Sequence, residues 1–156
     1  MLFILLIVFN LGYFAQSAKI DANIKKTDNS QFSILHQKEP GFSMKSSPAH
    51  KLIRIGKKAT EKLIVALDDS SKVIMAHLIL CHIWFAHVSF AGPKTVVTNN
   101  GDVFKYYLGE EKGEGLLISE IKKEDGTYIK YIEQKDLEKI KIYWNNKVTK
   151  SKSENK

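Results

Sequence analysis

Residues 47–90 read SPAHKLIRIGKKATEKLIVALDDSSKVIMAHLILCHIWFAHVSF, the densest apolar stretch beyond the extreme N-terminus. Within residues 58–67, apolar and small side chains recur at i, i+3, i+4 and i+7, the spacing of one helix face, which predicts a helix there. Gly56 predicts the end of a shorter helix over residues 49–55, because glycine commonly terminates helices. The stretch therefore predicts successive helices joined by turns.

A turn and a more apolar helix follow. The short polar side chains of residues 68–71 compete with helical backbone hydrogen bonds, so they predict a turn, and Ser70 or Ser71 is expected to cap the next helix. Residues 73–91 contain no formally charged residue and carry apolar side chains on every face, which predicts a buried helix. Its three histidines make a membrane-spanning position costly, so we expect this helix in a soluble core.

These helices resemble one unit of a HEAT-type repeat. The sequence IGKKATEKLIVALDD is followed after a short interval by AHLILCHI, a pattern of helix, Asp-containing turn and Ala/Leu-rich helix. The likeness covers residues 52–84, and the sequence holds no second copy. HEAT repeats are usually protein-binding scaffolds, so the resemblance implies a helical pair that binds a protein.

Beyond Gly92-Pro93 the pattern changes from helical to extended. Short alternating segments separated by turn residues predict four antiparallel strands, at residues 95–98, 103–108, 115–121 and 127–132. Residues 133–146 return to a helical stripe, and the polar, Lys-rich tail of residues 147–156 is expected to be disordered. The predicted fold class is α+β, with an N-terminal helical hairpin, a small antiparallel sheet and a C-terminal helix.

The N-terminal region predicts export. Residues 1–14 are apolar, and the small residues Ala15 and Ser17 fit a cleavage site, so residues 1–17 are predicted to be a secretory signal peptide. No basic residue precedes Lys19, which leaves an uncleaved membrane anchor as the alternative. We expect a periplasmic or secreted protein, or one attached to the membrane by its first 14 residues.

The remaining chain divides into three parts. Residues 18–46 are mixed and polar, which predicts a flexible linker, with a short strand or helix near residues 32–35. Residues 47–146 are expected to form a single α+β domain. The tail follows this domain.

Composition limits the possible partners and cofactors. The formal net charge is +7, but Arg54 is the one arginine among 24 basic residues, and arginine is the usual reader of phosphates and bases. The sequence therefore disfavours specific nucleic-acid binding. The lone cysteine, Cys81, permits no intramolecular disulfide and no cysteine-based zinc site. No cofactor is predicted.

Histidines on the apolar helix are the candidates for catalysis or metal binding. His77 and Cys81 share a helix face at i, i+4 spacing, and His82 follows, but the nearest acidic residues are Asp68 and Asp69 in the preceding turn. Histidines satisfied inside a core explain this pattern better than a site does. The two aspartates are better explained as capping residues than as a carboxylate pair.

The C-terminal half is rich in aromatic residues. Tyr106, Tyr131 and Trp144 are interleaved with lysines, so they are candidates for contacting a protein partner. The glycine-rich segment 109–115 carries glutamates that would repel phosphate, so it is interpreted as a turn.

The expected function is that of an exported, non-enzymatic protein-interaction module, and a protein of the inhibitor or immunity type fits the same features. The alternative is a small periplasmic hydrolase or ligand-binding protein that uses His77 or His82 on the helix. An exposed imidazole beside a carboxylate would favour this alternative.

Overall fold

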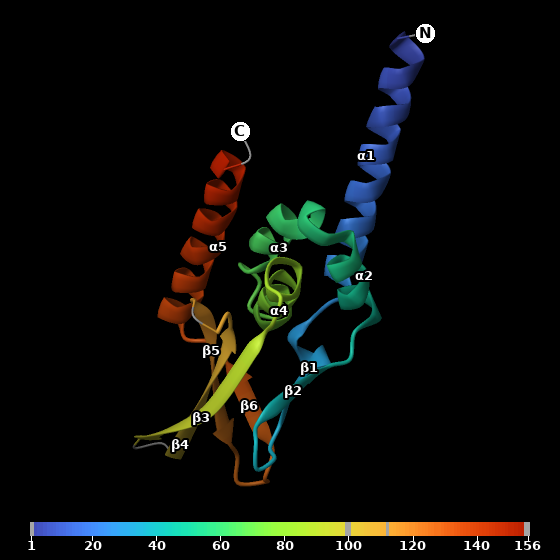
Figure 1. Ribbon diagram of the computed structural model, residues 1–156. Coiled ribbons are helices and arrows are strands. Elements are labelled where there is room, and N and C mark those ends of the chain that lie inside the picture. Colours follow the sequence, from blue (N-terminus) through green and yellow to red (C-terminus); the bar gives the residue numbers. More distant parts are fainter. Residues whose placement is uncertain (1, 99–100, 112, 155–156) are drawn as a thin grey trace.

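The computed structural model describes residues 2–98, 101–111 and 113–154, with side chains from Phe14 onward. The regular elements alternate between helices and strands (Figure 1). In chain order they are α1 (Leu2–Lys25), η1 (Asn29–Gln31), β1 (Phe32–Leu35), β2 (Gly41–Met44), α2 (Ser47–Ile55), η2 (Gly56–Ala59), α3 (Thr60–Ala66), α4 (Val73–Trp84), β3 (Ser89–Thr98), β4 (Gly101–Gly109), β5 (Gly115–Lys122), β6 (Tyr128–Tyr131) and α5 (Gln134–Glu154). The predicted α+β class is confirmed.

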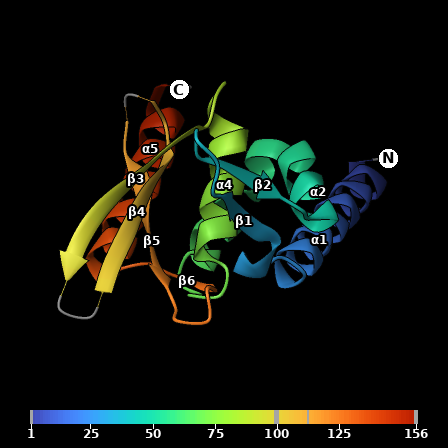
Figure 2. The same ribbon diagram turned by 90° about the horizontal axis from the view of Figure 1, so that it is seen from below.

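The central helix α4 organises the core. Every residue from Val73 to Cys81 is buried, as its uniformly apolar composition predicts. The helix contacts α2 and α3 on one side and strands β4 and β5 on the other. Seen from below, it lies between the sheet with α5 and the pair α1 and α2 (Figure 2). Burial of α4 therefore joins both halves of the molecule.

The four-stranded sheet has the order β3-β4-β5-β6 and is antiparallel throughout, in agreement with the prediction. The helix predicted for residues 73–91 is wrong in its second part. It ends at Trp84, and Ser89 to Ala91 pair with β4 as the start of β3. A short apolar run fits a half-buried strand as well as a buried helix, so the sequence pattern alone did not mark this boundary.

Gly92 lies inside β3 and does not end a helix. The register of β3 on β4 shifts between Ala91 and Lys94, and Gly92 occupies the bulge with a φ of +131°. A Cβ atom at this position would lie 2.7 Å from the carbonyl oxygen of Lys105. Only glycine fits both the conformation and the close approach of the two strands.

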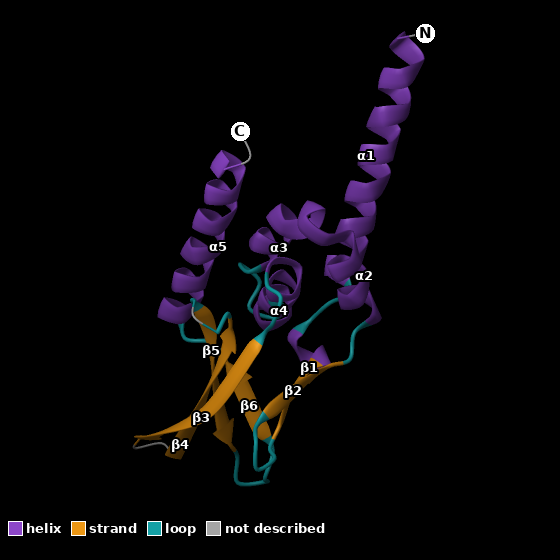
Figure 3. Cartoon of the chain, viewed as in Figure 1, coloured by secondary structure: helices purple, strands orange, loops and turns teal. Residues whose placement is uncertain are grey.

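The flexible linker predicted for residues 18–46 differs from the structure. This segment holds the end of α1, η1 and a hairpin of β1 and β2 (Figure 3). The short strand expected near residues 32–35 is present as β1. The isolated apolar residues Ile20, Phe32 and Ile34 are buried in the common core. Tertiary contacts thus order a segment whose local composition is polar.

The tail predicted to be disordered is also ordered as far as it is described. Helix α5 continues through Glu154, well beyond the predicted end at residue 146. Val148 is half-buried, and Lys152 forms an ion pair with Glu61 of α3 at 2.7 Å. These contacts with α3 account for the extra turns of helix.

Helix α1 extends beyond the rest of the molecule at its N-terminal end (Figure 1). The predicted signal peptide or anchor falls largely on residues 1–13, whose side chains lie outside the described part of the chain. Among the described residues, no helix has the length and apolarity that a membrane crossing requires.

The cap of α4 comes from a distant residue, not from Ser70 or Ser71 as predicted. The Asn29 side-chain oxygen accepts hydrogen bonds from the backbone N–H groups of Ile74 at 2.9 Å and Met75 at 3.3 Å. Its amide group donates to the carbonyl oxygen of Ser70 at 2.8 Å. Asn29 therefore satisfies two of the free N–H groups at the start of α4.

We expect Asn29→Ala to lower the free energy of unfolding by about 0.5–2 kcal/mol, the usual effect of removing an N-cap. Asn29→Asp is the matched control, because it retains the acceptor oxygen and removes only the donor to Ser70. Urea unfolding followed by circular dichroism measures both. Equal losses for the two variants would contradict the capping role of the oxygen.

Candidate functional site

His77 is a structural residue in the core. Its side chain is fully buried, and both ring nitrogens are engaged: Nε2 donates to the carbonyl oxygen of Leu108 at 2.8 Å, and Nδ1 accepts from the Trp144 indole N–H at 3.0 Å. The Cys81 sulfur lies 3.4 Å from Nε2. Burial lowers the pKa of His77 to about 4, against the opposing effect of the Leu108 hydrogen bond. This neutral, fully bonded ring has no nitrogen left for a substrate or metal.

His82 is exposed near the end of α4. Partial desolvation and the neighbouring His50 both lower its pKa. In the part of the chain that the structure describes, no group of three or more His, Cys, Asp or Glu side chains is placed to hold a metal ion. The helix histidines therefore do not converge on a shared site.

The aromatic candidates for partner binding occupy different environments. Tyr106 is 3% exposed and Trp144 is 0% exposed, so both predictions are corrected: these side chains belong to the core. Tyr131 is half-buried at the edge strand β6. The Tyr106 ring stacks on Phe90, and the Trp144 ring packs against His77 and Phe85. Sequence spacing did not reveal these contacts.

The two other sequence features are structural as well. Asp69 accepts hydrogen bonds from Ser71 and pairs with Lys72, which lowers the pKa of its carboxyl group to about 2. Asp68 pairs with Lys141 of α5. The glycine-rich segment forms a turn in which the Tyr107 hydroxyl donates to the carbonyl oxygens of Glu110 and Gly113. The glycine-rich segment is a turn, as interpreted from the sequence. The two aspartates stabilise their turn and pair with lysines, but neither side chain caps a helix, so that part of the interpretation is wrong.

A polar cluster that the sequence reasoning missed lies between the β1–β2 hairpin and the sheet. The carboxylate of Glu120 is buried and lies 2.7 Å from Nε2 of His36. The Tyr106 hydroxyl is hydrogen-bonded to the same carboxylate, and burial raises the pKa of Tyr106 to about 12. The His36 ring is stacked on Tyr128, with ring centroids 4.2 Å apart.

This His36–Glu120–Tyr106 cluster borders a small pocket of about 220 Å³, with Phe104 and Pro93 among its walls. A carboxylate that holds one imidazole nitrogen orients the other, which is the arrangement a general base requires. The cluster also links the β1–β2 hairpin to β5, and this structural role by itself explains the three residues. The signal in the sequence was Glu120 itself, since it continues the inward-facing alternation of Leu116 and Ile118 on β5.

A groove of about 750 Å³ lies between α1, α3 and α5. Its apolar lining comes from Ile20 of α1, Trp84 at the end of α4 and Val148 of α5. The Trp84 indole N–H donates to the Thr60 hydroxyl at 3.0 Å, which fixes the ring in place. The Lys57 ammonium lies 4.5 Å from the Trp84 ring centroid.

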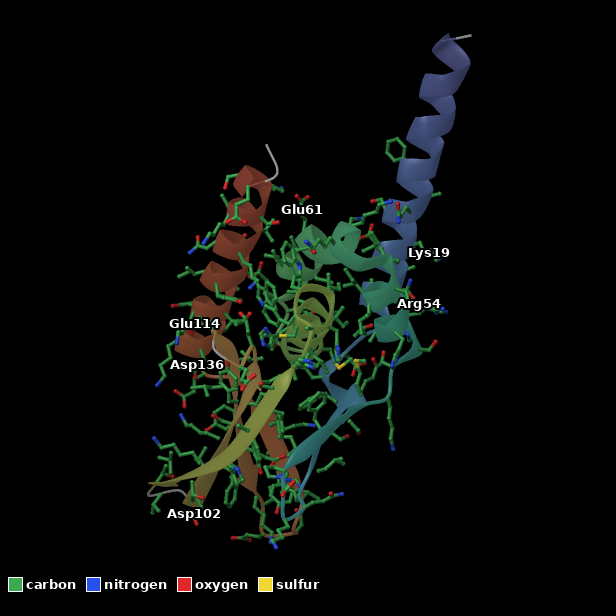
Figure 4. All side chains as sticks on the ribbon, viewed as in Figure 1. Lys19, Arg54, Glu61, Asp102, Glu114 and Asp136 are labelled. Atoms are coloured by element: carbon green, nitrogen blue, oxygen red, sulfur yellow. The ribbon has the colours of Figure 1, made fainter. Side chains whose placement is uncertain are left out.

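The rim of the groove is charged. Lys57, Lys58, Lys62 and Lys152 are opposed by one lining carboxylate, Glu61. The rim joins the three helices, because Lys62 pairs with Asp21 of α1 and Lys152 pairs with Glu61. Figure 4 labels Glu61 at the end of the molecule where α1 and α5 project. The site thus combines an apolar floor with a positive rim.

A second basic feature lies between α1 and α2. This basic cleft, of about 610 Å³, is lined by Lys19 of α1, by Lys26 just after α1, and by Lys51 and Arg54 of α2. Figure 4 labels Lys19 and Arg54 on these neighbouring helices. No carboxylate belongs to its described lining.

Comparison with known proteins identifies no matching protein family, no matching curated protein and no matching solved structure. The class that the fold defines is an α+β protein with a helical groove. Its function has to be inferred from the chain's own surfaces.

Proposed function

We propose that this chain is an exported, non-enzymatic interaction module, held at the membrane by its N-terminal segment, that binds an acidic segment of a partner protein. The observation that carries the proposal is the groove between α1, α3 and α5, with its apolar floor and positive rim. Charge complementarity selects an acidic partner, and an apolar floor supplies contact area.

The floor contains the kind of residue that anchors protein interfaces. Trp84 is half-buried and held by Thr60, so a partner side chain would meet a ring that is already fixed. Preorganised aromatic residues contribute strongly to binding because little conformational freedom is lost. The HEAT-like stretch of residues 52–84 supplies Trp84 to this floor, and its resemblance to protein-binding scaffolds supports the same role.

Contacts of α1 with the body favour retention of the N-terminal segment. The Lys62 ammonium donates to the hydroxyl oxygen of Ser17 at 2.7 Å and to its carbonyl oxygen at 3.2 Å. Lys58 contacts the Gln16 side chain at 3.4 Å. Cleavage after residue 17 would remove Gln16 and Ser17 from the α1 wall of the groove and leave Ile20. We therefore expect the anchored form, rather than the secreted form, to be the functional one.

The test is quantitative capture from native membrane extract with the full-length chain in detergent. A photo-reactive amino acid in place of Val148 is expected to crosslink a partner segment rich in Asp and Glu. Lys58→Glu combined with Lys152→Glu reverses the charge of the rim and should reduce the captured amount by about tenfold or more, because the acidic segment is then repelled.

The matched control is Lys94→Glu combined with Lys123→Glu, the same charge change at exposed positions in β3 and in the turn between β5 and β6. It should capture the partner as well as the unmodified chain does. Equal capture by the rim variant, or crosslinks to segments without acidic residues, would refute the groove as the binding site.

A further inference from the structure

The basic cleft between α1 and α2 concentrates positive charge without internal neutralisation. Lys19, Lys26, Lys51 and Arg54 take part in no ion pair among the described residues. The groove on the other side of α1 is different, because Lys62 and Lys152 there are paired with carboxylates. Four like charges around one cleft repel one another, so an anion in the cleft would relieve the repulsion.

The arrangement of the four residues follows from their helices. Lys19 lies in the last two turns of α1, and Lys26 directly follows the last residue of that helix; both line the cleft. Lys51 and Arg54 are three apart on α2, which also places them on one face. All four side chains are exposed. Arg54, the sole arginine of the chain, offers a planar fork of donors that matches phosphate oxygens.

The cleft lies next to the apolar part of α1. Residues 2–18 contain no charged residue, and at 1.5 Å per helical residue they extend about 25 Å. Lys19 is the first charged residue after them, and the body of the molecule begins just before it, where Gln16 and Ser17 contact Lys58 and Lys62. If residues 2–15 enter a bilayer, Lys19 lies about 6 Å further along the helix, at the level of the lipid headgroups, which form a layer about 5–7 Å thick on each side.

We propose that the basic cleft binds the phosphate groups of anionic phospholipids at the surface of the membrane that receives the N-terminal part of α1. The apolar segment supplies attachment, and the cleft supplies preference for negatively charged lipid. The proposal shares with the proposed function the retention of residues 1–18, but it does not depend on the groove. A bilayer surface is favoured over a soluble acidic partner because the cleft adjoins the uncharged segment.

The experiment measures the partition of the full-length chain, diluted from detergent, onto preformed vesicles separated by flotation. Vesicles of phosphatidylcholine are compared with vesicles that also contain phosphatidylglycerol, over a lipid titration at low and high salt. Lys51→Gln combined with Arg54→Gln removes two cleft charges on α2 and leaves the apolar segment unchanged. The matched control is Lys94→Gln combined with Lys123→Gln, at exposed positions in β3 and in the turn between β5 and β6.

The unmodified chain and the control are expected to favour the anionic vesicles, and high salt should weaken this preference. The cleft variant should lose about 30-fold in partition onto anionic vesicles, given the usual contribution of each basic residue near such a surface, and should be unchanged on phosphatidylcholine. Equal partition of the unmodified chain onto both vesicle types would overturn the proposal, as would equal behaviour of the cleft and control variants.

Inorganic phosphate separates the lipid from a soluble anion. One outcome would assign the cleft to a soluble phosphate and overturn the lipid assignment. In that outcome, millimolar phosphate raises the melting temperature of the unmodified chain but not of the cleft variant, and vesicle charge has no effect on partition. A failure of the lipid proposal can be distinguished from a failure of the proposed groove function, since the cleft variant should still capture the acidic partner. A cleft variant that loses the partner but keeps its lipid preference would overturn the proposal in favour of a protein ligand.

Discussion

Trp144→Ala should lower the free energy of unfolding by about 3–5 kcal/mol, the usual cost of truncating a buried aromatic side chain. Trp144 is fully buried, stacks on Phe85 with ring centroids 5.5 Å apart and donates to Nδ1 of His77. The side chain joins α5 to α4, so its removal leaves both a cavity and an unpaired acceptor. Urea or thermal unfolding monitored by circular dichroism measures the loss.

Trp144→Phe separates these two effects. Phenylalanine retains most of the packing but cannot donate to His77, and a buried acceptor without a partner costs about 1–3 kcal/mol. Trp84→Phe is the matched control, because it removes the same N–H group from a half-buried tryptophan whose acceptor is the Thr60 hydroxyl. A smaller loss for Trp84→Phe is expected. Equal losses would mean that the buried His77–Trp144 hydrogen bond contributes no more to stability than the Trp84–Thr60 hydrogen bond.

The second large effect is a dependence of stability on pH. His77 has a pKa of about 4 in the folded protein and about 6.5 when exposed, so between these values the unfolded chain binds the additional proton. Stability is therefore full above pH 6.5 and falls as the pH falls toward 4. From the two pKa values, the loss between pH 7 and pH 5 is about 2 kcal/mol.

The measurement is a series of urea unfolding curves from pH 7 to pH 5. This pH range lies above the range in which the carboxyl groups of Asp69 and Glu133 change the stability. Their pKa values are lowered to about 2, and their stabilising effect is lost only as the pH falls below their unfolded pKa values. His82→Gln is the control for the exposed helix histidine and should retain most of the slope. A flat profile for the unmodified chain would exclude a buried neutral His77.

Elements with strong local signals were predictable from the sequence. The helix end at Gly56, the helical stretch within residues 58–67 and the four antiparallel strands follow from periodicity and turn residues, which act over a few neighbours. Boundaries inside the continuous apolar run were not predictable. Residues 85–91 leave the helix because the edge of β4 offers backbone partners to Ser89 and its neighbours.

The sites depended on contacts between distant parts of the chain. His36 and Glu120 are 84 positions apart in the sequence and meet across the hairpin and the sheet. Neither carries a motif. The aromatic candidates were chosen by composition, and Tyr106 and Trp144 proved to be core residues because the direction of a side chain is set by what its element packs against.

The sequence by itself determined the class of this protein, the uncharged N-terminal segment and the buried central helix, because hydrophobic periodicity and charge are properties of the local chain. The tertiary structure alone decided the rest. It brought Asn29 to the start of α4, closed His77 between Leu108 and Trp144, and gathered unpaired basic residues from α1 and α2 into one cleft. Such constellations join residues far apart in sequence, and only the packing of whole elements fixes which of them meet.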